Sequence, residues 1–251
     1  MMDREAIMKH CSKALPFFCA LVVACGAPPP SPVDEIVDAH IAARGGIEAI
    51  EAIESIRFSG TATGSGGRIA QVVLEIKRPG LYRLEFSSQG TKAVFAHDGD
   101  IGWQVAPGQG VFEPEPIDPD QDPEAGIDER DFEGPLVHWR EKGHTVELVG
   151  RVTLPGGEAD KLEITLSDGG IRYDYVDVAT HQLVRADKSE TIAGRELWLE
   201  ESFSDFREVD GLVFPHRIET HVSDRPETIT VTVEKVELNP EIDDTRFRFP
   251  G

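Results

Sequence analysis

The chain has 251 residues, of which 39% are hydrophobic and 28% charged, with 46 acidic residues against 25 basic ones and a formal net charge of −21. Its length and apolar content suffice for one globular domain, which excludes a protein that is disordered throughout. The negative charge repels phosphate backbones and therefore argues against nucleic-acid binding. The longest apolar run, residues 14–24, is too short for a membrane-crossing helix, which needs roughly 20 residues.

The first 25 residues have the organisation of an export signal. Three basic residues, Arg4, Lys9 and Lys13, precede the apolar run. A basic region followed by an apolar region of about 7–15 residues is typical of a secretory signal peptide. The run ends in Val22-Val-Ala-Cys25-Gly26, which resembles the bacterial lipobox, whose cysteine is lipidated and becomes the mature N-terminus. We therefore expect residues 1–24 to be a lipoprotein signal peptide and Cys25 to be the site of lipid attachment.

The cysteine distribution agrees with this interpretation. All three cysteines, Cys11, Cys19 and Cys25, lie in the N-terminal segment, so the remainder is expected to be an exported domain without disulfides. Residues 25–32 carry the lipidated cysteine and a proline-rich tether. Because the mature body is acidic, its membrane attachment depends on acyl chains. Gly26 resembles the sorting pattern for the outer membrane, facing the periplasm. The alternative is an ordinary cleaved secretory signal with an incidental cysteine.

Two short helices are predicted at the start of the folded domain, which we place at residues 33–251. The sequence Ser31-Pro32-Val33-Asp34 has the pattern of a capping box with proline at the first helical position, and Gly45-Gly46 is a stop signal. A second helical segment, marked by Ile47, Ile50 and Ile53, ends near residue 55. The pair is amphipathic and needs an apolar surface on which to lie.

From Ile56 onward the apolar residues alternate with a period of two, as in half-buried strands separated by short glycine turns. One face of the sheet is predicted to be dry. The other carries Arg83, Glu85, Lys161, Glu163, Arg172, Asp174 and Glu200 and is predicted to be wet. An antiparallel sheet of about ten or eleven strands would curl around its dry face. The expected fold is mainly β with a few helices: an incomplete, half-open β-barrel covered by N-terminal and mid-chain helices.

An acidic, proline-containing segment, residues 113–133, separates the two halves of the strand series and is predicted to be a loop. A short helix is expected to follow it at residues 134–143, with its apolar side chains closing one mouth of the barrel. Within the loop, four carboxylates have the spacing of a calcium loop: Asp118, Asp120, Asp122 and Glu129. Because Pro123 replaces the required glycine, a solvated acidic loop is preferred over a weak calcium site, and no metal is expected.

The chain resembles the bacterial outer-membrane lipoprotein-sorting proteins, the LolA/LolB-like group and related lipid-binding lipoproteins. The resemblance covers most of residues 33–250 and rests on residues 40–46, 131–137, 142–150, 206–218 and 236–240 together with Phe247. It implies an incomplete antiparallel barrel wrapped around helices, with an apolar cavity for acyl chains. The residues expected to line that cavity are Val72, Leu74, Ile76, Tyr82, Leu84, Phe86, Leu136, Trp139, Leu162, Ile164, Leu166, Leu197, Leu199, Ile229, Val231 and Val233.

The expected function is that of a membrane-anchored, non-enzymatic carrier or binder of a lipid, a lipoprotein acyl chain or another amphiphile in the bacterial cell envelope. No cofactor is implied, and the expected partner is a lipid or an acylated protein. An alternative is an acidic scaffold lipoprotein that engages a basic partner and has no ligand cavity. An exported hydrolase ranks last, because no nucleophile–base pair or ligand set is visible; His216 and His221, for example, are expected on opposite faces of a strand.

Overall fold

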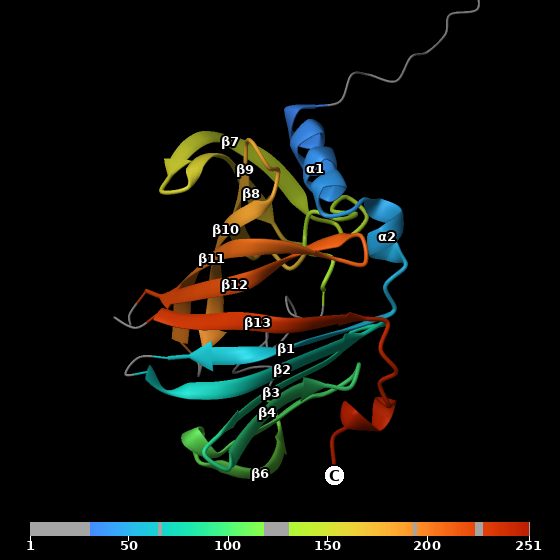
Figure 1. Ribbon diagram of the computed structural model, residues 1–251, viewed down its shortest axis with the longest axis vertical. Coiled ribbons are helices and arrows are strands. Elements are labelled where there is room, and N and C mark those ends of the chain that lie inside the picture. Colours follow the sequence, from blue (N-terminus) through green and yellow to red (C-terminus); the bar gives the residue numbers. More distant parts are fainter. Residues whose placement is uncertain (1–30, 65–66, 118–130, 193–194, 224–227, 251) are drawn as a thin grey trace, which may run out of the picture.

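The computed structural model describes residues 31–64, 67–117, 131–192, 195–223 and 228–250. Its main feature is one antiparallel sheet of thirteen strands in the order β6-β5-β4-β3-β2-β1-β13-β12-β11-β10-β9-β8-β7 (Figure 1). The strands are β1 Ser55–Thr63, β2 Ile69–Lys77, β3 Leu81–Ser88, β4 Thr91–His97, β5 Gly102–Ala106, β6 Val111–Pro116, β7 Thr145–Leu154, β8 Gly157–Thr165, β9 Ile171–Asp177, β10 Leu183–Ile192, β11 Arg195–Val209, β12 Leu212–Val222 and β13 Thr228–Leu238. The predicted fold, mainly β and incompletely closed, is confirmed.

The sheet consists of two meanders. Strands β1–β6 and strands β7–β13 each pair with their neighbours in sequence, and the two series meet at the β1–β13 pair. At this junction the register shifts between Ser59 and Gly60. A bulge of this kind increases the local twist of a sheet and helps it to curl. The curl gives the sheet an inner face, which packs against the helices, and an outer face.

The sheet has more strands than the expected ten or eleven. One reason is β6, whose acidic residues and prolines led to the prediction of a loop. This strand pairs with β5 through Gln104–Glu115 and Trp103–Pro116, so residues 113–116 belong to a strand and not to the predicted loop. Proline is tolerated there because β6 has a neighbour on one side only. The short turn η2 Pro107–Gln109 connects β5 to β6.

The two predicted helices are present as α1 Pro32–Ala43 and α2 Ile47–Glu51. The capping box at the start of α1 is confirmed, since the Ser31 side chain accepts from the Asp34 backbone and Asp34 accepts from the Ser31 backbone. Both helices lie on one side of the sheet (Figure 1). No helix within the described residues is long and apolar enough to cross a bilayer.

Each helix packs on its own part of the apolar core. Val37 of α1 joins the cluster formed by Leu136, Val146, Leu162, Ile164 and Val176. Ile50 and Ile53, in and just after α2, join a second cluster that is built mainly from β1–β3, β12 and β13. The backbone amide of Val213 donates to the carbonyl of Arg44, which fixes the end of α1 to β12. The helices therefore close off the inner face of the sheet.

Residues 131–143 connect the two meanders and form consecutive turns instead of the expected short helix. Their side chains Leu136 and Val137 are buried, one in each core cluster. The burial of these two side chains stabilises the segment, as the packing of an apolar face would stabilise a helix. Residues 1–24, the tether residues 25–30 and Cys25 lie outside the described residues, as do the calcium-spaced residues Asp118, Asp120, Asp122 and Glu129.

The outer face is not wet along its whole length. The C-terminal segment, with the turn η3 Asp244–Arg246, crosses the outer face of β1–β5. Trp103 Nε1 donates to the carbonyl of Phe247 at 2.7 Å, and Phe247 is fully buried. Beneath the segment, the buried carboxylates of Glu75 and Glu85 are paired with arginines from β1, β3 and η3. The predicted wet face is thus partly covered by the chain's own C-terminal segment.

The inner and outer faces of β9 are the reverse of those predicted. Arg172 and Asp174, expected on the wet face, pair with Ile164 and Leu162 of β8 and lie with them on the inner face. Asp174 is fully buried. Alternation alone was ambiguous here, because both residue sets of β9 contain apolar members. Two charged side chains are therefore placed inside the curled sheet.

Candidate functional site

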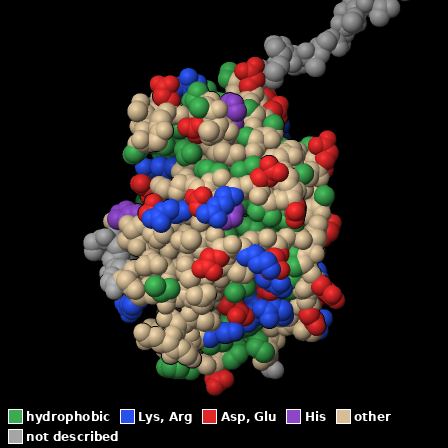
Figure 2. Space-filling model, viewed as in Figure 1, with side chains coloured by type: hydrophobic (Ala, Val, Ile, Leu, Met, Phe, Trp, Pro, Cys, Tyr) green, Lys and Arg blue, Asp and Glu red, His purple; other side chains and the backbone are tan. Residues whose placement is uncertain are grey.

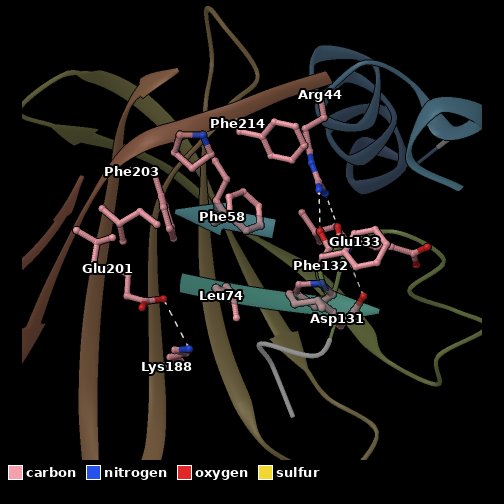
Figure 3. Close-up of a pocket in the computed structure, with 18 of the residues that line it drawn as sticks. Arg44, Phe58, Leu74, Asp131, Phe132, Glu133, Lys188, Glu201, Phe203 and Phe214 are labelled. Atoms are coloured by element: carbon pink, nitrogen blue, oxygen red, sulfur yellow. Dashed lines mark hydrogen bonds and ion pairs between the residues drawn. The ribbon is translucent and has the colours of Figure 1, made fainter. Parts of the chain in front are cut away.

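A cavity of about 720 Å³ lies between the inner face of the sheet, the end of α1 and residues 131–144. Figure 3 shows its lining side chains. A volume of this size is within the range of small-molecule and cofactor sites, about 300–1,000 Å³. The apolar lining comes from both meanders. The main apolar side chains are Phe58, Val72, Leu74, Ile76, Leu84, Phe86, Phe203, Phe206, Phe214, Ile218, Val231 and Val233.

The aromatic rings and aliphatic side chains form a continuous apolar wall along β1–β3 and β11–β13. Phe58 and Phe214 are in edge-to-face contact, with ring centroids 5.7 Å apart. Gly60 also lines the cavity, and its lack of a side chain lets β13 approach closely. The only chemistry that this wall offers is burial of apolar groups.

Residues 131–143 cover one side of the cavity, and Arg44 at the end of α1 fixes them there. The Arg44 guanidinium donates to the carbonyl oxygens of Phe132, at 3.1 Å, and Glu133 (Figure 3). Burial lowers the pKa of Arg44 from its ordinary value, while the charges of Asp131 and Glu133 act in the opposite direction. Two further contacts join the covering segment to the helices: Arg140 pairs with Asp34, and His138 contacts Glu51.

Glu133 is the buried charge at the centre of this cover. Its carboxylate accepts from Arg78 and lies 3.5 Å from the Lys142 ammonium. Burial raises the pKa of Glu133, but the hydrogen bonds and charges of Arg78 and Lys142 outweigh burial, so the pKa is lowered. Lys142 Nζ also donates to Asp131 at 2.5 Å and to the Gly134 carbonyl at 2.9 Å. The cover is therefore held by ion pairs, by hydrogen bonds to its backbone carbonyls and by the burial of Leu136 and Val137, and not by regular secondary structure.

We expect Arg44→Ala to loosen the cover. The substitution removes charged donors from two carbonyl groups at the cavity rim and costs about 2–3 kcal/mol of unfolding free energy. Hydrogen exchange at the amides of residues 132–143 should accelerate more than exchange in β12. Arg68→Ala removes the same charge from an exposed position and is the control. Unchanged exchange in 132–143 would contradict this account of Arg44.

The opposite wall of the cavity is polar. Arg172 of β9, Lys188 of β10 and Glu201 of β11 line it. Arg172 and Lys188 are register partners on neighbouring strands, 8% and 7% exposed. The Lys188 ammonium lies 3.7 Å from the Glu201 carboxylate. In Figure 3 this pair lies on the side of the cavity away from Arg44. The cavity thus has an apolar middle and a charged group at each side.

His40 of α1 is a buried histidine beside the cavity. Its Nδ1 donates to the backbone carbonyl of His181 at 2.8 Å, and Gln182 donates to the carbonyl of Ala43 at 2.9 Å. These bonds fix α1 to the β9–β10 turn. Burial first, and then the charge of Arg44, lower the pKa of His40 from 6.5 to about 4. His40 is therefore neutral in the folded protein at neutral pH.

The depressed pKa of His40 predicts a loss of stability in mild acid. Between the unfolded pKa of 6.5 and the folded pKa of about 4, the unfolded chain binds more protons, so the free energy of unfolding falls as pH falls. We expect His40 to account for a loss of about 2 kcal/mol between pH 7.5 and pH 5. Urea unfolding of wild type and His40→Asn at both pH values tests this; parallel pH profiles would refute it.

The structure brings nine of the sixteen predicted lining residues together around the cavity. They are Val72, Leu74, Ile76, Leu84, Phe86, Leu136, Leu166, Val231 and Val233. The other seven do not line it. Tyr82, Leu162 and Ile164 are inside the core clusters, Trp139 packs against one, Leu197 and Leu199 form a small cluster with Val222, and Ile229 is 42% exposed near the start of β13.

Sequence reasoning missed the aromatic and charged parts of the lining. Phe203 and Phe206 both line the cavity although they are three residues apart, because Asp205, with φ 55°, interrupts the alternation of β11. Phe214 comes just before the two histidines of a predicted strand, His216 and His221, and no sequence pattern marked it as a lining residue. Arg172, Lys188 and Glu201 were not predicted to line the cavity, because charged side chains were expected on the outer face of the sheet.

The described residues show little that resembles catalytic machinery. Within the described ranges, no group of three or more His, Cys, Asp or Glu side chains is arranged to hold a metal ion. His216 is buried and its Nδ1 donates to the Phe214 carbonyl at 3.1 Å, whereas His221 is exposed. The chemistry that the cavity offers is burial of apolar groups combined with recognition of charge.

Comparison with solved structures identifies the architecture. A DUF1329 family protein from Desulfovibrio piger matches with a TM-score of 0.60 and 14% sequence identity, over 87% of this chain and 98% of that one. A LolA superfamily protein from Nitrosomonas europaea matches with a TM-score of 0.59, 14% identity and the same two coverages. The chain has the LolA-like fold. A structure described as a "putative outer membrane lipoprotein-sorting protein domain", from Vibrio parahaemolyticus, agrees, with a TM-score of 0.58 and 13% identity over 85% and 94% of the two chains.

The chain is similar to LolA-like proteins in structure, but its sequence identity to them is low. No protein-family model matches the chain, and no curated protein matches it. At 13–14% identity and TM-scores of 0.58–0.60, what the chains share is the overall fold. The predicted resemblance to the lipoprotein-sorting group is confirmed at this level of the fold.

Proposed function

We propose that this protein is a non-enzymatic carrier or binder of an amphiphile, such as a lipid or a lipoprotein acyl chain, in the bacterial cell envelope. The observation that carries the proposal is the cavity of about 720 Å³ with an apolar wall along β1–β3 and β11–β13. The LolA-like fold is a second support, because one matched structure is described as a lipoprotein-sorting domain.

Burial of hydrocarbon is the driving force for binding. Each methylene moved from water to the apolar wall contributes about 0.8 kcal/mol, so a chain with roughly a dozen buried methylenes gains on the order of 10 kcal/mol. Part of this gain is offset by the entropy of association. This driving force requires no covalent chemistry.

The cover formed by residues 131–143 is the proposed gate. Besides the apolar packing of Leu136 and Val137, it is held to the helices and the β2–β3 turn by ion pairs and hydrogen bonds of Arg44, Arg78 and Arg140. Polar contacts of this kind exchange with water more readily than a packed apolar interface. The helices and the region near Leu136 and Trp139 would move aside to admit a chain to the inner face.

Lipidation of Cys25 and outer-membrane attachment belong to the same proposal. The residues that follow Cys25 include three prolines, Pro28 to Pro30, before the first helix, which suits an extended tether. An anchored binder would hold its cavity close to the bilayer from which a ligand is taken. Metabolic labelling with an alkynyl fatty acid, compared between wild type and Cys25→Ala, tests the attachment; equal labelling would refute it.

The outer face does not specifically favour the alternative of an acidic scaffold. Acidic and basic side chains are interspersed over the face seen in Figure 2. Two outer carboxylates are paired with arginine, as in Arg185–Asp187 and Arg217–Glu219. Pairing reduces the single-sign field that would attract a basic partner over a distance.

Native mass spectrometry tests the binding function. A secreted form of residues 26–251, behind an ordinary secretory signal, would be purified from a Gram-negative host without detergent and then extracted for lipid. We expect a bound amphiphile in the intact mass and in the extract. Absence of bound lipid, together with failure to bind a fluorescent acyl probe, would overturn the proposal.

A further inference from the structure

Among the described residues, one end of strands β1–β6 and β13 carries no acidic side chain, although the chain as a whole has 46 Asp and Glu residues. The turns β1–β2, β3–β4 and β5–β6 and the start of β13 lie at this end (left side of Figure 1). Its charged residues are two cations, Arg68 and Lys92, and Lys92 pairs with Glu85. We call this surface the acid-free end, and define it as residues 61–64, 67–73, 86–92, 104–112 and 228–233.

Three large apolar side chains are exposed on the acid-free end. Ile69 is 58% exposed, Phe112 72% and Ile229 42%. Thr63 of β1 pairs with Ile69 on one side and with Thr230 on the other, so Ile229 is only two strands away from Ile69. Exposed apolar side chains that are grouped and surrounded by polar residues mark an interaction surface.

The acid-free end continues into the apolar wall of the cavity. Val72 of β2 and Val231 of β13 line the cavity, and each lies within three residues of an exposed isoleucine on its own strand. Phe86 of β3 also lines it. Further along β3, the Ser88 hydroxyl donates to the carbonyl of Ile69 at 2.8 Å, which joins the ends of β2 and β3. Hydrocarbon at this end is therefore close to the side chains that form the cavity wall.

The opposite end of the same strands lacks this combination. Ile101, in the β4–β5 turn, is 44% exposed, but Asp98 and Asp100 lie beside it in the turn. The Asp98 carboxylate accepts from the backbone amides of Asp100 and Ile101, at 3.0 and 2.8 Å, so the negative charge is fixed next to the exposed isoleucine. Ile101 is thus a matched reference for the exposed side chains of the acid-free end.

The charge distribution favours a bilayer as the occupant of the acid-free end. A protein with a formal net charge of −21 is repelled by the anionic head groups of a membrane, and a surface without carboxylates is the one that can approach closely. A basic protein partner would find no carboxylate with which to pair there. Isoleucine and phenylalanine side chains are stabilised at the boundary between head groups and acyl chains.

We infer that the acid-free end is the surface with which this protein contacts a lipid bilayer, inserting Ile69, Phe112 and Ile229 below the head groups. Repulsion of the acidic remainder orients the molecule, and burial of the three side chains attracts it. The inference rests on the proposed function for its purpose: it places one end of the cavity wall against the membrane that supplies or receives the amphiphile.

Photocrosslinking tests which surface touches lipid. A benzophenone amino acid replaces residue 69, 112 or 101 in the full chain, and each protein is irradiated with phosphatidylcholine nanodiscs. Benzophenone inserts into nearby C–H bonds, so lipid adducts are measured by intact mass. We expect positions 69 and 112 to give on the order of tenfold more lipid adduct than position 101, a ratio that the burial of one large apolar side chain supplies.

Variants assign the contact to the exposed side chains. With benzophenone at position 112, Ile69→Ser should lower the yield of lipid adduct about tenfold, and the matched control Ile101→Ser should leave it unchanged. Gln71→Glu places a carboxylate on the acid-free end and should lower the yield more in nanodiscs that contain phosphatidylglycerol than in phosphatidylcholine alone. All these positions are exposed, so the variants are expected to fold.

The outcomes separate this inference from the proposed function. Equal lipid adducts at the three positions, or none at any of them, would overturn the bilayer surface. Adducts from positions 69 and 112 to protein, a second copy of the chain included, would also overturn it. Titration with a soluble fluorescent acyl probe, without nanodiscs, tests the cavity alone, and wild type and Ile69→Ser should bind the probe equally. No probe binding in a wild type that still gives selective adducts would overturn the proposed function and leave the bilayer surface in place.

Discussion

Replacing Leu74 by Trp is expected to lower the binding of a long-chain acyl probe by at least tenfold while leaving the protein folded. Leu74 lies in the middle of the apolar wall, only partly buried, with its side chain toward the cavity (Figure 3). The larger ring would extend into open volume and occupy the space of several methylenes, each contributing about 0.8 kcal/mol to ligand binding. Filling an open cavity avoids the strain of overpacking a dense core.

Gln71→Trp on the same strand is the control for Leu74→Trp. Gln71 is exposed and pairs with Ser87, so the added ring lies outside the cavity and probe binding should match that of wild type. Fluorescent-probe titration and urea unfolding would be measured on both variants. Unchanged binding in a folded Leu74→Trp protein would show that the ligand does not use this cavity.

Gly60→Ala is expected to cause the largest loss of stability of any single-methyl substitution in the sheet. A Cβ atom at Gly60 would lie 2.0 Å from the carbonyl oxygen of Thr232 and 3.0 Å from the Cα of Val233. Both contacts are with the backbone, so no side chain can rotate away. Separating β1 from β13 at their junction should cost about 3–5 kcal/mol, a range reserved for severe steric or packing defects.

Gly64→Ala provides the comparison, because a Cβ at Gly64 meets nothing within 4 Å. Its stability should stay within about 0.5 kcal/mol of wild type, as for an ordinary surface substitution. Thermal and urea unfolding of both alanine variants would be compared. Similar stabilities for the two would mean that the β1–β13 junction relaxes without cost.

The sequence predicted the elements whose local signals agree with their tertiary setting. The capping box at Ser31 and Asp34, the second helical segment and the alternating strands of β2 and β3 are examples. For these strands the apolar face is the buried face, so the period of two also located Val72, Leu74 and Leu84 at the cavity.

The failures occurred where long-range contacts override the local pattern. Glu75 and Glu85 are buried because the C-terminal segment, far away in sequence, covers them. Residues 131–143 form turns and not a helix, held by hydrogen bonds from Arg44 to their backbone carbonyls and by the Arg78–Glu133 ion pair. Arg172 and Lys188 violate the rule that charges lie outside, and such violations tend to occur at functional sites. Neither periodicity nor composition contains this information.

The two-meander topology has a thermodynamic consequence for the proposed binding function. Within the sheet, the meanders β1–β6 and β7–β13 are joined by a single strand pair, and the cavity is lined by Leu74 from one meander and Phe203 from the other. A bound amphiphile would contact both meanders and reinforce the β1–β13 junction. By mass action, ligand at a hundredfold excess over Kd would add about 2.7 kcal/mol to the free energy of unfolding, and release of the ligand would remove that contribution.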